Sequence, residues 1–317
     1  MAELSGININ FDSLGYALSL DPRQNRDPSY FEVADRFLDL ADRHGFRYTI
    51  FVIGQDLENP EVAVRVREWH QRGHEVGNHS YSHPHNLGSL GRSAIEREVM
   101  KSHELIFNAC GREPRGFIAP GWATSTDLLD VLIEHRYLYD TSLLPSCFMW
   151  LASAKVYWNY RDHERRRSVL QRRDWLANLV GSREPFLTDG KSLVRRCEKG
   201  LVVLPLPATP VLRLPLWHSM SFVFPIKLFE YVLVSTLGMR YFYYLLHPSD
   251  LAGLEDIPPG YAARSRAQDP GRMAVPLEQR TRHLDEILGE IKRRSRKMVT
   301  LETMAESFLA EQASARA

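Results

Sequence analysis

The sequence is poor in cysteine, and its three cysteines lie far apart. Cys110, Cys147 and Cys197 form no C-x-x-C pair in a chain of 317 residues. This spacing excludes a metal site built from paired cysteines and is typical of proteins from a reducing compartment. The first five residues combine neither a basic start nor an apolar stretch, so we expect no secretory signal peptide.

Long apolar runs and a strong net charge are also absent. No uninterrupted apolar run approaches the roughly 20 residues that a membrane-spanning helix needs. The 40 basic and 39 acidic residues give a formal net charge of +1, which argues against a general nucleic-acid binder. From these absences we expect a cytoplasmic protein, with the inner face of the membrane as an alternative location.

What the sequence has is a regular alternation of predicted strands and helices. Period-two and β-branched runs predict strands at 6–12, 47–53, 74–78, 115–119, 137–140, 201–207, 240–247 and 298–301. Helical periodicity predicts helices at 30–44, 60–72, 93–109, 126–135, 225–237 and 276–295, with a last helix after 301. Such βα units at roughly 35-residue intervals predict parallel strands joined by crossover helices. We therefore expect one α/β domain over residues 1–317, with C-terminal helices in 276–317.

Residues 145–200 interrupt this alternation and are predicted to form a helical insertion. Aromatic and apolar residues between Phe148 and Tyr160 are followed by a series of arginines that ends at Arg173. An interfacial segment over 148–173 would place aromatics at the headgroup level of a membrane and arginines on anionic lipid. A homo-oligomer contact accounts for the same residues, and a helical lid is the third interpretation.

Two histidines four residues apart form the strongest candidate for chemistry. His79 and His83 follow the predicted strand at 74–78, and neutral imidazole is a common ligand for divalent transition metals. The spacing alone is equally compatible with two loop histidines that are close by chance, because this stretch supplies no third ligand.

Polar residues follow several predicted strands at the point where each strand ends. They are Asp12, His79, His83, the turn from Pro120 to Trp122, Asp140 and His247. The carboxyl ends of parallel strands lie at the same open end of a barrel or the same edge of an open sheet, which we call the mouth. We therefore expect these residues together at the mouth. Asp12 then supplies the missing third ligand beside the two imidazoles. A divalent metal held in this way is suited to metal-assisted hydrolysis.

Successive motifs in this order resemble those of a known family. They are His79-Ser-Tyr-Ser-His83, Ile118-Ala-Pro-Gly-Trp122, Tyr139-Asp-Thr-Ser142 and Leu245-Leu-His247. The chain is similar to the polysaccharide deacetylases (NodB-homology, or carbohydrate esterase family 4) from about residue 6 to 305, apart from 145–200. Residues Val299 to Glu302 look like the last strand of that family.

The resemblance implies a distorted (β/α)7 barrel with an Asp-His-His site for a divalent metal, usually zinc. It also implies hydrolytic removal of an N-acyl group from an amino sugar. His79 and His83 would be metal ligands, and His247 would be the general acid that protonates the leaving amine. The expected partner is an N-acylated sugar of bacterial surface polysaccharide or lipopolysaccharide O-antigen, or its lipid-linked or nucleotide-linked precursor.

The chain departs from the family pattern at two positions. Most members carry two acids near the end of strand one, whereas this chain has Asn10-Phe11-Asp12-Ser13. We favour Asp12 as the ligand with Asn10 in the position of the base, although the adjacent register makes Asp12 the base. The arginine expected before A-P-G-W is Ile118. These losses predict either a base supplied elsewhere, with Asp140 and Asp250 as candidates, or a protein that binds metal and saccharide without efficient turnover.

Three further residues have a structural interpretation beside the functional one. Trp122, with Pro120, is a candidate wall for a sugar ring, or else a core tryptophan. Asp140 is a candidate substrate-binding residue, although an aspartate here more often caps the following turn. His218, in Leu216-Trp217-His218, is a candidate to reach the mouth of the barrel, but we expect it on the surface.

Overall fold

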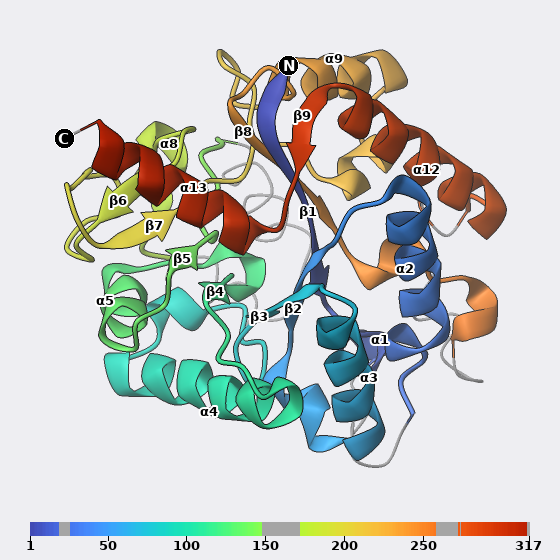
Figure 1. Ribbon diagram of the computed structural model, residues 1–317, viewed down its shortest axis with the longest axis horizontal. Helices are drawn as coiled ribbons and strands as arrows, with labels where there is room; N and C mark the ends of the chain where they lie inside the picture. The colour runs from blue at the N-terminus through green and yellow to red at the C-terminus, as the bar shows by residue number, and fades with distance from the viewer. Residues whose placement is uncertain (19–25, 148–171, 258–271, 273, 316–317) are drawn as a thin grey trace, which may run out of the picture.

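A curled sheet forms the centre of the computed structural model, with helices around it (Figure 1). The structure describes residues 1–18, 26–147, 172–257, 272 and 274–315. Nine strands occur within these residues: β1 (Ala2–Phe11), β2 (Thr49–Val52), β3 (Glu75–Asn78), β4 (Gly116–Phe117), β5 (Tyr139–Asp140), β6 (Phe186–Thr188), β7 (Leu201–Val203), β8 (Tyr241–Leu246) and β9 (Ser295–Met298).

The strand order is β6-β7-β5-β4-β3-β2-β1-β8, and β9 pairs with the start of β1. β1 pairs in parallel with β2, β8 and β9, and the ladder from β2 to β5 and β7 is parallel throughout. Successive strands lie side by side, which is the usual result of right-handed crossovers through helices. The predicted α/β barrel of parallel strands is confirmed.

The helices begin and end where local sequence signals place them. They are α1 (Leu14–Leu18), α2 (Glu32–His44), α3 (Pro60–Gln71), α4 (Arg92–Cys110), α5 (Thr126–Glu134), α8 (Trp175–Val180), α9 (Ile226–Thr236), α12 (Leu277–Arg293) and α13 (Leu301–Ser314). The Asn59 side chain accepts from the Glu61 N–H at the start of α3, and Ser125 accepts from Leu128 at the start of α5. Gly45 and Gly111 end α2 and α4 with φ of 70°, a left-handed conformation that glycine adopts without strain.

Side chains connect the two sides of the curled sheet across its interior. Tyr243 on β8 is buried, and its hydroxyl lies 2.6 Å from the Thr141 hydroxyl, just after β5. The same hydroxyl donates to the Leu204 carbonyl, just after β7. These bonds join strands that are not neighbours in the sheet, so the interior near the strand ends is a packed polar layer.

Two of the predicted elements are wrong in detail. The last strand is Ser295–Met298, and Leu301 and Glu302 begin α13 instead of extending a strand. The Thr300 side chain accepts from the Thr303 N–H, so this threonine ends the extended segment by capping the helix. The described part of the insertion, 172–200, is not purely helical: α8 is followed by β6, which pairs antiparallel with β7.

The prediction that His218 lies on the surface is also wrong. His218 is fully buried, and its Nδ1 lies 2.9 Å from the Tyr244 hydroxyl on β8. Burial lowers the pKa of His218 to about 4, so the imidazole packs as a neutral group. Residues 148–171, which carry most of the proposed interfacial segment, lie outside the described residues. No helix in the described ranges is long and apolar enough to cross a membrane.

Candidate metal centre

The turn that carries His79 and His83 is held in place by a carboxylate from α4. Glu98 Oε2 accepts from the backbone N–H groups of Tyr81 and Ser82, and Oε1 accepts from the Ser82 hydroxyl. The backbone N–H of His83 donates to the Ser80 hydroxyl. The turn is therefore held both by α4 and by its own Ser80 hydroxyl. Sequence reasoning missed Glu98, because nothing in the spacing between residues 80 and 98 indicates the contact.

Two residues of this turn adopt a backbone conformation that non-glycine residues rarely use. Ser80 has φ of 63° and His83 has φ of 56°. The Ser80 N–H donates to the Asn78 side-chain oxygen, and Asn78 is itself held by the Val99 carbonyl and the Tyr137 hydroxyl. These buried bonds stabilise the strained turn, and strain of this kind is common at functional sites.

Asp12, His79 and His83 converge, as the strand-end argument predicts. Asp12 Oδ1 lies 3.1 Å from His79 Nε2 and 3.2 Å from His83 Nε2. The two Nε2 atoms are 3.2 Å apart. These three are the only group of potential ligands within the described part of the chain whose ligand atoms all lie within 4.8 Å of one another. Both histidines are buried, whereas the Asp12 side chain is partly exposed.

The donor set fits a divalent ion of the size of zinc. His79 Nδ1 donates to the Ile118 carbonyl at 2.7 Å, which leaves the Nε2 lone pair of the neutral imidazole toward Asp12 and His83. Zinc–nitrogen and zinc–oxygen bonds of about 2.0–2.2 Å in a tetrahedron separate neighbouring ligand atoms by about 3.3–3.6 Å. The observed separations of 3.1 and 3.2 Å come close to that range.

The electrostatics of the group favour an ionised Asp12 and a neutral His83. Burial would raise the pKa of Asp12, but the charge that His83 carries when protonated, the contacts with the His79 and His83 rings, and the charge that His247 carries when protonated hold it well below its ordinary value. Burial lowers the pKa of His83, although Asp12 opposes this. An anionic carboxylate beside two neutral imidazoles is the protonation state in which these side chains bind metal.

His247 is the fourth titratable residue at this centre. Its Nε2 lies 4.0 Å from Asp12 Oδ2, so it faces the carboxylate oxygen that the two histidines do not contact. Its backbone N–H donates to Asp250, which forms a buried ion pair with Arg272 at 2.8 Å. Burial lowers the pKa of His247, while Asp12 and Asp250 oppose the shift. Asp250, a candidate substitute base, is thus occupied by Arg272 and by the His247 backbone.

The two departures from the family pattern lie close to this centre. Asn10 is buried near the end of β1, two residues before Asp12, and its Oδ1 accepts from the Asn8 side-chain amide at 3.1 Å. An amide in this position cannot take up a proton. Ile118 is fully buried in the hydrophobic core, and its backbone carbonyl holds His79. An apolar side chain therefore occupies the position where the resemblance predicts an arginine.

The structure places the remaining candidates around the turn after β4 and at the end of β5. Pro120 is buried, and the Trp122 ring packs against Trp217 with centroids 5.0 Å apart. Arg172 donates to the carbonyls of Gly121 and Trp122 and pairs with the buried Asp174. The interfacial interpretation of 148–173 includes Arg172, whose side chain is instead buried at this turn.

Asp140 is buried and bonds to the turn that follows β5. Its carboxylate accepts from the Ser142 hydroxyl at 2.5 Å and from the Ser142 N–H at 3.2 Å. Ser142 in turn accepts from the Ala119 N–H, so the three residues join the ends of β4 and β5. Burial raises the pKa of Asp140 to about 7. The bonds that the structure gives Asp140 are those of a turn cap, which is the structural interpretation of this residue.

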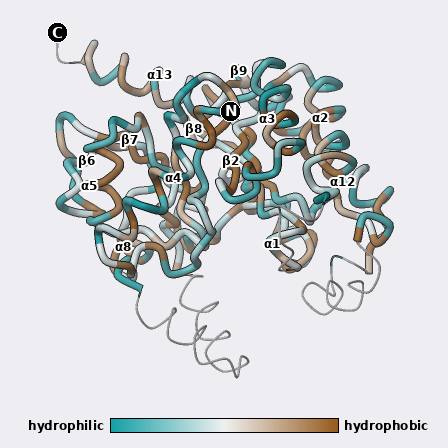
Figure 2. Tube along the Cα trace, turned by 90° about the horizontal axis from the view of Figure 1, so that it is seen from below, coloured by the Kyte–Doolittle hydropathy of each residue, from teal (hydrophilic) through white to brown (hydrophobic). Residues whose placement is uncertain are grey.

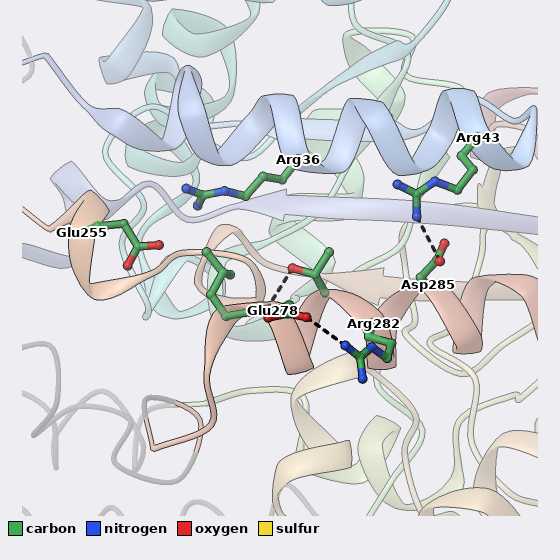
Figure 3. A pocket seen from close by; sticks show the side chains of 8 residues that line it. Arg36, Arg43, Glu255, Glu278, Arg282 and Asp285 are labelled. Carbon is green, nitrogen blue, oxygen red and sulfur yellow. Dashed lines mark hydrogen bonds and ion pairs between the residues drawn. The ribbon is translucent and has the colours of Figure 1, made fainter.

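A groove of about 650 Å³ lies elsewhere, between α2 and α12 (Figure 3). Its charged lining is largely neutralised by ion pairs: Arg43 with Asp285 at 3.0 Å and Arg282 with Glu278 at 2.8 Å. Arg36 in the same groove pairs with Asp256. The groove contains none of the residues of the metal centre, so we assign it no part in the chemistry.

The chain is a mostly parallel α/β barrel with an Asp-His-His group near its strand ends, and comparisons show which proteins it is similar to. The polysaccharide deacetylase family model matches residues 25–139, which include His79, His83 and Trp122 but neither Asp12 nor His247. The predicted resemblance to the polysaccharide deacetylases is therefore confirmed.

Curated relatives match over part of their length. The peptidoglycan deacetylase of Helicobacter pylori is 28% identical over 155 residues, which cover 49% of this chain and 50% of the relative. The chitooligosaccharide deacetylase of Sinorhizobium fredii is 35% identical over 94 residues, or 29% of this chain and 42% of the relative. The matched stretches thus span half or less of these relatives.

A solved structure from Mycobacterium smegmatis, assigned to the polysaccharide deacetylases, has the same fold. It aligns with a TM-score of 0.59 over 98% of this chain and 91% of its own, at 16% identity. The similarity extends the fold assignment beyond the region that the family model matches, to β1, β8 and the C-terminal elements.

Proposed function

We propose that this protein removes an N-acyl group, acetyl or formyl, from an amino sugar by metal-assisted hydrolysis. The observation that carries the proposal is the convergence of Asp12, His79 and His83, with His247 4.0 Å from Asp12, in a chain related to the polysaccharide deacetylases. The relatives include a peptidoglycan deacetylase and a chitooligosaccharide deacetylase. These names support an N-acylated saccharide as the substrate.

The roles of the residues follow from their positions. Asp12, His79 and His83 would hold the ion, for which zinc is our proposal because the donor set and spacing suit it. When bound, the ion polarises the amide carbonyl and makes water a better nucleophile at neutral pH. His247 would protonate the departing amine nitrogen, so that water and amide become carboxylate and free amine. Trp122 would lie against a sugar ring.

The substrate that we propose is an amino sugar of a bacterial surface polysaccharide, such as lipopolysaccharide O-antigen, or its lipid-linked or nucleotide-linked precursor. The second candidate is a protein that binds metal and saccharide with little turnover. It is favoured by Asn10, which cannot act as a base, and by Ile118, which replaces an arginine.

Metal content and product release test the proposal. The purified protein is analysed for bound metal by mass spectrometry, and acetate and formate release is measured with chitooligosaccharides, peptidoglycan fragments and N-acylated sugar nucleotides. We expect about one zinc per chain and release of one acyl product. His83→Ala should lose both, whereas His70→Ala on α3, outside the centre, should keep both.

The outcomes separate the candidates. Bound metal with no release from any substrate would support the low-turnover candidate. The absence of a bound divalent ion in the native protein would contradict both candidates. A metal content that His83→Ala leaves unchanged would also contradict both.

A further inference from the structure

Five apolar side chains are exposed in one region beside the strand ends. Leu176, Leu179 and Val180 lie on α8, and Val211 and Leu212 lie at the tip of a hairpin whose arms pair at Ala208 and Pro215. Val211 and Leu212 are 84% and 62% exposed, so the hairpin projects apolar surface into solvent. We call these five residues the α8–hairpin patch.

Hydrogen bonds join the two parts of the patch. Arg213, next to Leu212, donates to the Gly181 carbonyl, next to Val180, at 2.8 Å. Arg183 donates to the Ala208 carbonyl at the base of the hairpin at 2.9 Å. The end of α8 and the hairpin tip therefore form one continuous surface.

Positive charge surrounds the patch. Arg183 and Arg213 lie close enough that, besides the effect of burial, the charge of Arg213 lowers the pKa of Arg183. Arg196, exposed, donates to the Ser182 hydroxyl between Gly181 and Arg183. Glu184 is the acid that interacts with Arg183 and Arg196, so the two arginines share one carboxylate and Arg213 adds a third positive charge beside Arg183. The neighbouring Asp174 is already neutralised by Arg172.

The patch lies on the same side of the molecule as the metal centre. In Figure 2, α8 and α1 lie at the lower edge, while the N-terminus, β9 and α13 lie at the upper edge. α1 directly follows the carboxyl end of β1, which carries Asp12. Arg172, just before α8, holds the turn of Gly121 and Trp122 through two hydrogen bonds of 2.9 Å. A surface that contacts the patch would therefore lie beside the mouth.

We propose that the α8–hairpin patch docks this protein on an anionic lipid bilayer. The apolar side chains enter the boundary between headgroups and acyl chains, and Arg183, Arg196 and Arg213 contact lipid phosphates. A second copy of the chain fits less well, because a two-fold contact would bring the two arginine groups together. The docked orientation places the mouth at the membrane and so selects lipid-linked saccharides. That selection rests on the proposed function, whereas docking itself does not.

Vesicle co-sedimentation of the full chain tests docking without any substrate. The probes are phosphatidylcholine vesicles with and without 30% phosphatidylglycerol, at low and high salt. We expect binding to the anionic vesicles to exceed binding to neutral ones by about tenfold, and to weaken with salt. V211S combined with L212S should reduce the binding by about tenfold, because affinity scales with inserted apolar area. R196E should weaken binding at low salt only.

A matched control uses exposed apolar residues on other helices. Val64→Ser with Phe107→Ser, on α3 and α4, should leave vesicle binding unchanged. Circular dichroism and thermal unfolding verify that all variants are folded.

Vesicle binding that is absent, or that V211S with L212S leaves intact, would overturn the proposal. A dimer detected by sedimentation and abolished by the same pair, without vesicle binding, would assign the patch to self-association instead. Hydrolysis of soluble substrates is measured separately, so a failure of docking is distinguishable from a failure of the proposed function.

Discussion

At the scale of residues, three side chains from distant parts of the chain make the site. Asp12 directly follows the first strand, whereas His79 and His83 come from a turn held by Glu98 and Asn78. Hydrogen bonds from the protein itself hold this turn, which supports the positions of His79 and His83. His247 and Asn10 are the two residues near this centre whose proposed roles are distinct from metal binding.

His247→Gln should reduce kcat while leaving metal content unchanged. The His247 Nε2 faces Asp12 Oδ2 at 4.0 Å and is outside the group of three ligand atoms. Loss of a general acid typically costs about 10²- to 10⁴-fold. Steady-state kinetics and metal analysis of the same preparation provide the check. A variant with full kcat would remove His247 from the mechanism.

Asn10→Asp should increase the rate of acyl release if the centre has lost its base. The Asn8 side-chain amide, 3.1 Å from Asn10 Oδ1, is already placed to donate to a carboxylate at this position. A gain of about tenfold or more is expected, the lower part of the range for acid–base groups. Asn8→Asp is the matched control, because Asn8 lies two residues earlier on the same strand and further from Asp12. An unchanged rate in Asn10→Asp would indicate that the native base lies elsewhere.

At the scale of elements, buried polar bonds fix the segments that carry the site. Arg172 joins the start of α8 to the turn of Gly121 and Trp122, and Asp250 joins the end of β8 to Arg272. At the opposite ends of the strands, Glu75 at the start of β3 accepts from the Glu302 N–H in the first turn of α13. These contacts link segments that are far apart in the sequence.

Arg172→Ala should destabilise the protein and raise KM, whereas Arg173→Ala should do neither. The Arg172 pair with Asp174 is buried, so removal of the arginine leaves an uncompensated carboxylate and costs about 3–5 kcal/mol. Arg173 pairs with Asp127 at the surface, where such a pair contributes about 0–1 kcal/mol. Urea unfolding and KM measurements separate the two neighbours. Equal effects of both substitutions would contradict this account.

At the scale of the whole molecule, buried carboxyl groups couple stability to pH. Burial raises the pKa of Asp56, Glu75 and Asp140 to about 7 each. A carboxyl group whose pKa is higher in the folded state binds more protons when folded. Its contribution to stability is therefore complete below the unfolded pKa and is lost as pH rises through the folded pKa. Histidines with lowered pKa, such as His218, have the opposite pH dependence, so the test compares variants.

Glu75→Gln should gain stability relative to the native chain as the pH rises from about 4.5 to 8. The pKa of Glu75 rises from 4.5 to about 7 on folding, which corresponds to a change of up to about 3 kcal/mol. The glutamine keeps an acceptor for Thr49 and for the Glu302 N–H. Unfolding by urea at several pH values measures the difference, with exposed Glu198→Gln as the flat control. A difference that does not vary with pH would contradict the raised pKa.

The sequence by itself determined most of the elements and the candidate ligands. The alternation of strands and helices, the caps at Asn59 and Ser125, and the position of Asp12 and the two histidines after strand ends follow from local periodicity and topology. Tertiary structure decided the rest, because it depends on contacts between distant residues. Burial of His218 against Tyr244 and the Arg172 bonds to the Trp122 turn depend on which groups meet in space. The type and spacing of side chains along the sequence do not indicate which distant groups come into contact.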